Sequence, residues 1–282
     1  MPAQPLGPTG LLAQSMTLPA GSQSMAMGGM GLRAQGMDGR KKAVGLAGRY
    51  LVVGGGGGTE RIGSGGGGAG EYLEGQTVLT PGIYAVTVGL GGNGTTISTN
   101  GAPSRAFGLF ARGGGAGKRN SGGVTGGSSG GGGGDGGNFT SPPPTGQNTN
   151  IGGTGAFSSG VYASGGGGGG AGGAGTNGTP SNGGDGGAGK LSDITGTAQY
   201  YAAGGRGGVI FSAPGNNGLG WATNNGSGGD GYLNADAPTG VVIWSYASPV
   251  QLCTGGTVTS YLNGSTRWWV HTFTSSGTLV VP

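Results

Sequence analysis

Residues 165–178 read GGGGGGAGGAGTNG, and from Gly166 onward every third position is a glycine. The same spacing of three recurs in the glycine runs that contain Gly130 and Gly183. A period of three without a hydrophobic stripe is typical of a polyproline-II-type helix, which rises ~3.1 Å per residue and makes no internal hydrogen bonds. Glycine lets such chains approach closely enough to hydrogen-bond through their backbones. We therefore expect residues 113–240 to form a bundle of polyglycine-II helices.

The composition of the chain supports a fold without α-helices. Glycine accounts for 81 of 282 residues, and only 8% of residues are charged. Each glycine in an α-helix costs about 1 kcal/mol relative to alanine, so we expect almost no α-helix. The low fraction of charged residues also distinguishes this chain from a solvated disordered linker, which is normally rich in charge. No stretch approaches the ~20 apolar residues of a membrane-spanning helix, and the sequence does not begin like a signal peptide.

A short internal repeat, Gly-Gly-Asp-Gly, occurs three times at similar intervals. Its copies are residues 133–136, 183–186 and 228–231. The repeat suggests that successive rods return to the same level of a bundle, although a glycine-rich chain can also produce such copies by coincidence. If the copies stack, Asp135, Asp185 and Asp230 could converge on a calcium ion. We prefer that they accept backbone N–H bonds or cap turns, and we predict no metal and no cofactor.

Short runs of β-branched and aromatic residues precede and follow the glycine-rich part, with Gly, Pro and Asn turns between them. The runs are residues 50–53, 77–79, 83–88, 106–110, 241–246, 257–262, 268–274 and 278–281. We expect those within 49–53, 83–88, 241–247 and 268–281 to gather in one β-rich region. The predicted fold is therefore mainly β and irregular, with the polyglycine-II bundle attached to a small β-rich region.

We therefore predict that the chain has four parts. They are an N-terminal attachment arm (1–43), a β-rich part (44–112), the polyglycine-II bundle with aromatic loops (113–240) and C-terminal β-strands (241–282).

Residues 1–43 contain all six methionines and four prolines, without a helical or strand period. Such a stretch cannot bury enough surface to offset ordering costs of ~1–2 kcal/mol per residue. Methionine is flexible and suits irregular interfaces, so we interpret the segment as an arm that docks onto another protein; a tail draped over the surface is the alternative. The docking candidates are Met16, Met25, Met27, Met30 and Met37.

The residue types needed for catalysis are scarce. Cys253 and His271 are the single cysteine and histidine, and together they cannot make a closed zinc site. A phosphate-binding Walker loop fails around Lys118, because Arg112 and Arg119 occupy positions that require glycine and Ser or Thr. The nine acidic residues are scattered, which disfavours the paired carboxylates of a glycosidase. Positive charge is too sparse for nucleic acid binding. We predict a protein that is not an enzyme.

The order of several motifs carries a family resemblance. Residues 49–58 read RYLVVGGGGG, residues 65–72 read GGGGAGEY, and residues 82–89 read GIYAVTVG. The pattern closes with GGDG at 228–231 and GVVIWSY at 240–246, and strand-like HTFTSSGTLV follows at 271–280. In this order the motifs resemble the glycine-rich domain of bacteriophage tail-fibre and adhesin proteins, over roughly residues 49–282.

The alternation of glycine runs and aromatic loops is also similar to the distal-tip adhesins of T-even-like phages. In those proteins the rods form a polyglycine-II bundle, and loops at one end bind the host surface. Two features depart from that pattern. Residues 1–43 do not match the attachment domain of those adhesins, and the strands at 271–280 resemble the broader tail-fibre domain.

The resemblance implies a tail-fibre or receptor-binding component of a virion, made in the host cytoplasm and extracellular after release. Its partners would be other virion proteins, through residues 1–43, and a bacterial surface glycan or outer-membrane protein. The protein could also form a homo-oligomer. We expect neither nucleic acid binding nor membrane insertion. The main alternative is a structural virion protein: a capsid decoration, head fibre or baseplate part. A depolymerase and an extracellular or ice-binding glycine-rich protein are minor alternatives.

Binding specificity in such a protein must come from the loops that connect the rods. The rods themselves present only glycine backbone, whereas loops tolerate sequence variation. Aromatic side chains make large contacts, so those in the connections are our receptor-binding candidates; packing on the bundle's own end is the alternative role for each. They are Phe139, Phe157, Tyr162, Tyr200, Tyr201, Phe211 and Trp221.

Overall fold

The computed structural model describes residues 45–60, 62–94, 97–158, 162–210, 213–223, 225–233 and 236–282. These residues belong to one compact unit, which runs from Lys41 to Pro282. The predicted attachment arm, residues 1–43, lies outside the described residues. Fourteen β-strands are present in the described part of the chain.

A five-stranded antiparallel sheet collects strands from both ends of the described chain. Its strands, in spatial order, are β12 (Thr257–Asn263), β13 (Thr266–Phe273), β11 (Val241–Ala247), β1 (Leu46–Val53) and β2 (Tyr72–Leu79). Arg49 of β1 lies opposite Ser245 of β11. The expectation that residues 49–53 and 241–247 meet in one region is therefore confirmed.

Alternate residues of β1 enter two different cores. Val52 packs in a cluster with Trp244 and Leu279, whereas Leu51 and Val53 pack in a second cluster with Ala residues of the glycine-rich part. This alternation follows from the period of two in a strand. Because both faces of β11 and of residues 51–53 in β1 are covered, these stretches are almost continuously apolar.

Two small antiparallel pairs cover the first of these cores. They are β3 (Gly82–Val86) with β14 (Gly277–Val281), and β4 (Ser104–Ala106) with β5 (Leu109–Ala111). Val86 of β3 and Leu279 of β14 contribute buried side chains to that cluster.

The glycine-rich segments are neither helix nor strand, and their hydrogen bonds follow a period of three. The N–H groups of Gly65, Gly68 and Glu71 donate to Lys118, Gly115 and Arg112. Those of Gly66 and Ala69 donate to Gly166 and Gly169, and those of Gly67 and Gly70 donate to Gly229 and Gly226. Successive residues therefore bond to three different neighbouring segments. We call this set of hydrogen-bonded glycine segments the glycine array.

Close approach of backbones explains why the glycine array needs glycine. A Cβ built on Gly67 would overlap the carbonyl oxygen of Gly57, and one built on Gly168 would overlap that of Gly67. The segment 54–58, on the N-terminal side of residue 113, belongs to the same array, because Gly57 donates to Gly68 at 2.8 Å.

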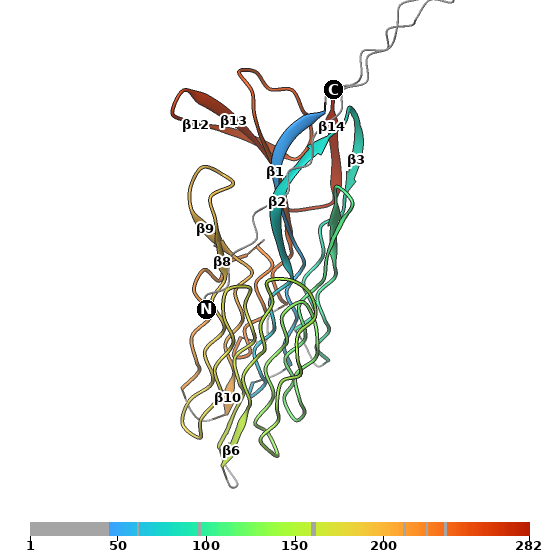
Figure 1. Cartoon of the computed structure of the whole chain (residues 1–282). Coiled ribbons are helices and arrows are strands. Elements are labelled where there is room, and N and C mark those ends of the chain that lie inside the picture. The colour runs from blue at the N-terminus through green and yellow to red at the C-terminus, as the bar shows by residue number, and fades with distance from the viewer. Residues whose placement is uncertain are drawn as a thin grey trace, which may run out of the picture. The chain divides into compact units, whose positions relative to one another are not determined.

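The remaining strands lie at the two ends of the glycine array. At one end, β6 (Ala156–Ser158), β7 (Tyr162–Ser164) and β10 (Val209–Ile210) form a three-stranded sheet. Figure 1 shows β6 and β10 at the end of the array away from β1 and β14. We call this the far end, and the other the sheet end. The hairpin of β8 (Lys190–Ser192) and β9 (Gln199–Tyr201) projects beside the large sheet.

The mainly β class is confirmed for the described residues, none of which is helical. The finer expectation, a bundle of polyglycine-II helices, is not established by this secondary structure.

Candidate binding site

The turns of the far end expose apolar side chains. Ile62, Phe157, Tyr232 and Leu233 are exposed, and Leu233 reaches 59%. Phe157 lies in β6 and the other three lie on turns, and contacts between their segments bring them together. Gly208 donates to Ser64, Gly231 donates to Arg206, and a Cβ on Gly63 would touch the Ile210 side chain. The far end is thus a surface made from several separate turns.

The predicted receptor-binding aromatics divide between the two ends of the array. Phe139, half-buried, and Phe157 lie toward the far end, where Phe139 donates its N–H to Gly133. Tyr162 belongs to β7 at the same end, and Phe211 lies outside the described residues. Tyr200, Tyr201 and Trp221 lie toward the sheet end, since β9 contains both tyrosines and Gly220 lies against Tyr200.

Tyr201 is not available to a partner. Only 5% of it is exposed, and it packs with Tyr72 and Ile194 in the second core. Trp221 donates its indole N–H to the Gly228 carbonyl at 2.6 Å and is half-buried. The described members of this set therefore do not form one surface, because consecutive connections of an up-and-down array alternate between its ends.

The aspartates of the Gly-Gly-Asp-Gly repeat bond to protein groups. Asp135 pairs with Arg119 at 2.8 Å, and Asp185 accepts the backbone N–H of Asn216 at 2.6 Å. Asp230 is buried, pairs with the Arg206 guanidinium and accepts the N–H of Tyr232, both at 2.9 Å. Within the described ranges, no three His, Cys, Asp or Glu residues gather in a way that could hold a metal ion.

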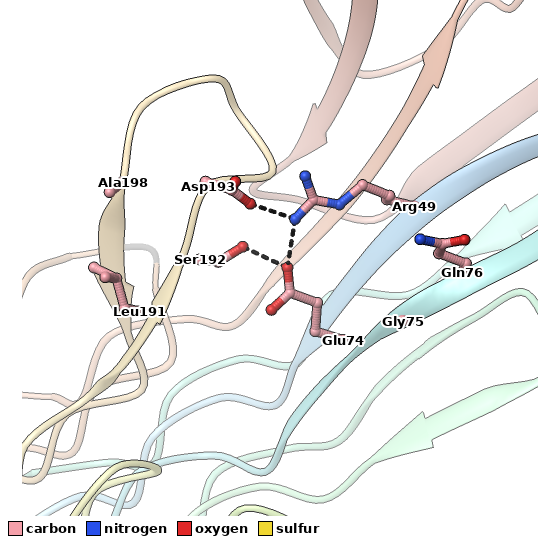
Figure 2. A pocket seen from close by; sticks show the side chains of 8 residues that line it. All are labelled: Arg49, Glu74, Gly75, Gln76, Leu191, Ser192, Asp193 and Ala198. Carbon is pink, nitrogen blue, oxygen red and sulfur yellow. Dashed lines mark hydrogen bonds and ion pairs between the residues drawn. The ribbon is translucent and has the colours of Figure 1, made fainter.

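A pocket of about 560 Å³, lined by both polar and apolar groups, lies between the large sheet and the β8–β9 hairpin. Arg49 projects from β1, Glu74 from β2, and Asp193 follows directly after β8 (Figure 2). The Arg49 Nη2 donates to Glu74 Oε1 at 3.1 Å and to the Asp193 carboxylate. Ser192 Oγ also donates to Glu74 Oε1, at 2.7 Å. The hairpin is thus tied to the sheet through charged groups.

The groups of this network shift one another's pKa values. Burial alone would lower the pKa of the Arg49 guanidinium, but its hydrogen bonds and charge interactions with Asp193 and Glu74 raise it. The hydrogen bond from Arg49 lowers the pKa of the Asp193 carboxyl. Burial, followed by a hydrogen bond to Glu74, raises the pKa of Tyr72. At neutral pH the Arg49 guanidinium and the Asp193 carboxylate therefore form a charged pair, and Tyr72 is protonated.

A second recess of about 220 Å³ lies across the Arg49–Asp193 pair. Tyr261 and Trp268 line it, with ring centroids 6.4 Å apart and planes 9° from parallel. Gly196 at the hairpin tip has φ +88°, and a Cβ there would overlap the Tyr261 ring. The hairpin can therefore rest directly against that ring.

Sequence reasoning did not find this pocket. Its residues come from three distant parts of the chain, and no motif connects them. The available signal was weak: Arg49 and Glu74 are charged residues in or beside strand-like runs of a chain with few charges.

A family model matches residues 45–246, well over half of the chain, and describes a glycine-rich domain. The chain belongs to the glycine-rich domain family. The matched residues contain the array, strands β1 to β10 and β11 as far as residue 246, together with Arg49, Glu74 and Asp193, whereas Tyr261 and Trp268 lie beyond them. No curated protein matched the sequence. The described residues contain no helix long and apolar enough to cross a membrane.

Proposed function

We propose that this glycine-rich domain protein is a tail-fibre or receptor-binding component of a bacteriophage virion. It binds the bacterial surface through the far end and performs no catalysis. A polyglycine-II bundle acts as its rigid stalk. The observation that carries the proposal is the period of three in the hydrogen bonds of the glycine array.

Three features support polyglycine II as the conformation of the array. A polyproline-II-type helix has three residues per turn and φ near −75°, so its N–H groups point toward three neighbours in rotation, as those of residues 65–70 do. None of the glycines in 54–58 or 65–70 has a positive φ. The overlap of an added Cβ with neighbouring carbonyl groups requires glycine at the contacts.

The position of the exposed turns supports a binding role for the far end. β1, where the described chain enters the fold, and β14, where it leaves, both lie at the sheet end (Figure 1). A partner that holds the sheet end leaves the far-end turns open. Phe157 and Tyr232 give this surface aromatic groups, which are frequent anchors in interfaces.

The proposal includes two partners. Residues 1–43 dock onto other virion proteins, and the far end contacts a bacterial surface glycan or an outer-membrane protein. The protein works on the virion, outside the cell in which it is made.

Adsorption of the purified, labelled chain to a panel of bacteria tests the proposal. The triple variant Phe157→Ala, Tyr232→Ala, Leu233→Ala should bind the responsive strain at least tenfold more weakly, because interface anchors each contribute ~2 kcal/mol or more. A matched control replaces Val78 and Ile83, exposed apolar residues on β2 and β3, with alanine. The control should adsorb normally.

Unchanged adsorption of the triple variant would contradict a receptor-binding far end. Absence of adsorption to every strain, together with far-end turns that intact particles protect from protease, would instead establish the structural virion role.

A further inference from the structure

We propose that the pocket at Arg49 and Asp193 is a binding site for a neutral saccharide. This site (Figure 2) lies between β1, β2 and the β8–β9 hairpin, which Figure 1 places toward the sheet end of the molecule, away from the far end. Its volume of about 560 Å³ is within the range of about 300–1,000 Å³ that is usual for ligand pockets.

The pocket offers hydrogen-bonding groups that the fold does not use. Within the described residues, Arg49 uses only Nη2 in its bonds to Glu74 and Asp193, so its Nε and Nη1 remain for a ligand. Gln76, exposed on β2, lines the pocket, and its side-chain amide makes no hydrogen bond to another described residue. Donors and acceptors lie side by side here, as the adjacent hydroxyl groups of a sugar require.

The charge of the pocket favours a neutral ligand. Arg49 is already paired with Glu74 and Asp193, so a charged ligand would have to compete with an existing ion pair. An apolar ligand would instead cover Arg49 and Gln76 without replacing their hydrogen bonds to water, which is costly. A ligand with many hydroxyl groups and no net charge avoids both costs.

The walls beside these polar groups suit the other face of a sugar. Tyr261 and Trp268 line the recess across the Arg49–Asp193 pair, and exposed Leu191 lines the main pocket. Aromatic rings present broad apolar faces on which the C–H face of a sugar can pack. Because both recesses share Arg49 and Asp193, one saccharide chain can extend across the pair.

The test is a titration of the full chain with neutral oligosaccharides built from glucose, galactose or mannose. Tryptophan fluorescence reports binding, because Trp268 lines the adjoining recess, and calorimetry gives the affinity. Asp193→Ala and Gln76→Ala should each weaken binding of the responsive sugar at least tenfold. Both side chains are exposed, so folding should persist, which circular dichroism verifies.

Two matched controls separate the site from general effects. Asp135→Ala removes another ion-paired surface carboxylate, and Gln147→Ala removes another exposed glutamine. Both should leave the affinity unchanged. The proposal is overturned if no neutral saccharide binds, if only acidic or cationic oligosaccharides bind, or if the pocket variants bind as well as the controls do.

The outcome is independent of the proposed function. The far-end triple variant should keep its saccharide affinity, and the pocket variants should keep the far-end turns intact. Titration with isolated polysaccharide from the strain that adsorbs the chain shows whether the sugar belongs to the cell surface. Binding of free sugars without that polysaccharide would assign the site to soluble saccharides instead.

Discussion

The sheet end and the glycine array are stabilised by different chemical groups of the polypeptide: side chains in the sheet and backbone in the array. In the large sheet, buried side chains such as Leu51, Trp244 and Tyr246 fill two cores. In the array, backbone N–H and carbonyl groups bond between segments, and most residues at the contacts have no side chain. The sheet should therefore be sensitive to the removal of atoms, and the array to their addition.

The largest expected effect is the loss of a core side chain at the sheet end. Trp244→Ala should lower the free energy of unfolding by about 3–5 kcal/mol, because it empties a fully buried site. Chemical denaturation measures the change. Trp268→Ala, at a half-buried site on the same sheet, should cost clearly less; equal losses would contradict the assignment of the core.

A sharper test compares adjacent residues on β9. Tyr201→Ala should lower the free energy of unfolding by about 3 kcal/mol, because only 5% of Tyr201 is exposed. Tyr200→Ala should cost less than about 1 kcal/mol, since 37% of that side chain is exposed. If both substitutions cost the same, the hairpin does not alternate between core and solvent as described.

Adding one methyl group to the array should also destabilise the protein. Gly67→Ala places its Cβ against the backbone of Gly57 and Gly229, neither of which can rotate away. We expect a loss of about 1–3 kcal/mol from overpacking. Gly173→Ala is the control, because its nearest neighbours lie at 3.5 Å and beyond. Equal stability of the two variants would refute close backbone contact as the reason for glycine.

The smallest effect is a pH dependence at the sheet end. His271 is buried beside Tyr246, and burial lowers its pKa below 6.5. The unfolded chain therefore binds a proton more readily, so stability should be complete above pH ~6.5 and fall as the pH drops below it, by at most ~1.4 kcal/mol per unit.

The variant His271→Gln removes the single histidine of the chain. Denaturation midpoints of both proteins between pH 7 and pH 5 measure the effect. The slope should be smaller in the variant. A slope of equal size in the variant would assign the pH dependence to carboxylates instead.

Local sequence patterns determined which segments form strands and which cannot form helices. The β-branched runs of β1 and β11 are extended because such side chains fit a pleated surface, and the abundance of glycine excludes α-helices. The period of three in the glycine runs also matches the hydrogen-bonding period of the array.

Only the tertiary structure decided which segments are neighbours. Gly67 bonds to Gly229, which is far away in sequence, and no side-chain pattern distinguishes that partner from other glycines. For the same reason, the sequence could not tell which end receives each connection, and it grouped Tyr200 and Tyr201 with Phe157. The pocket at Arg49 likewise exists only because folding brings β1, β2 and the β8–β9 hairpin together. Local propensity depends on nearby residues, whereas these contacts depend on how long-range backbone bonds close the whole array.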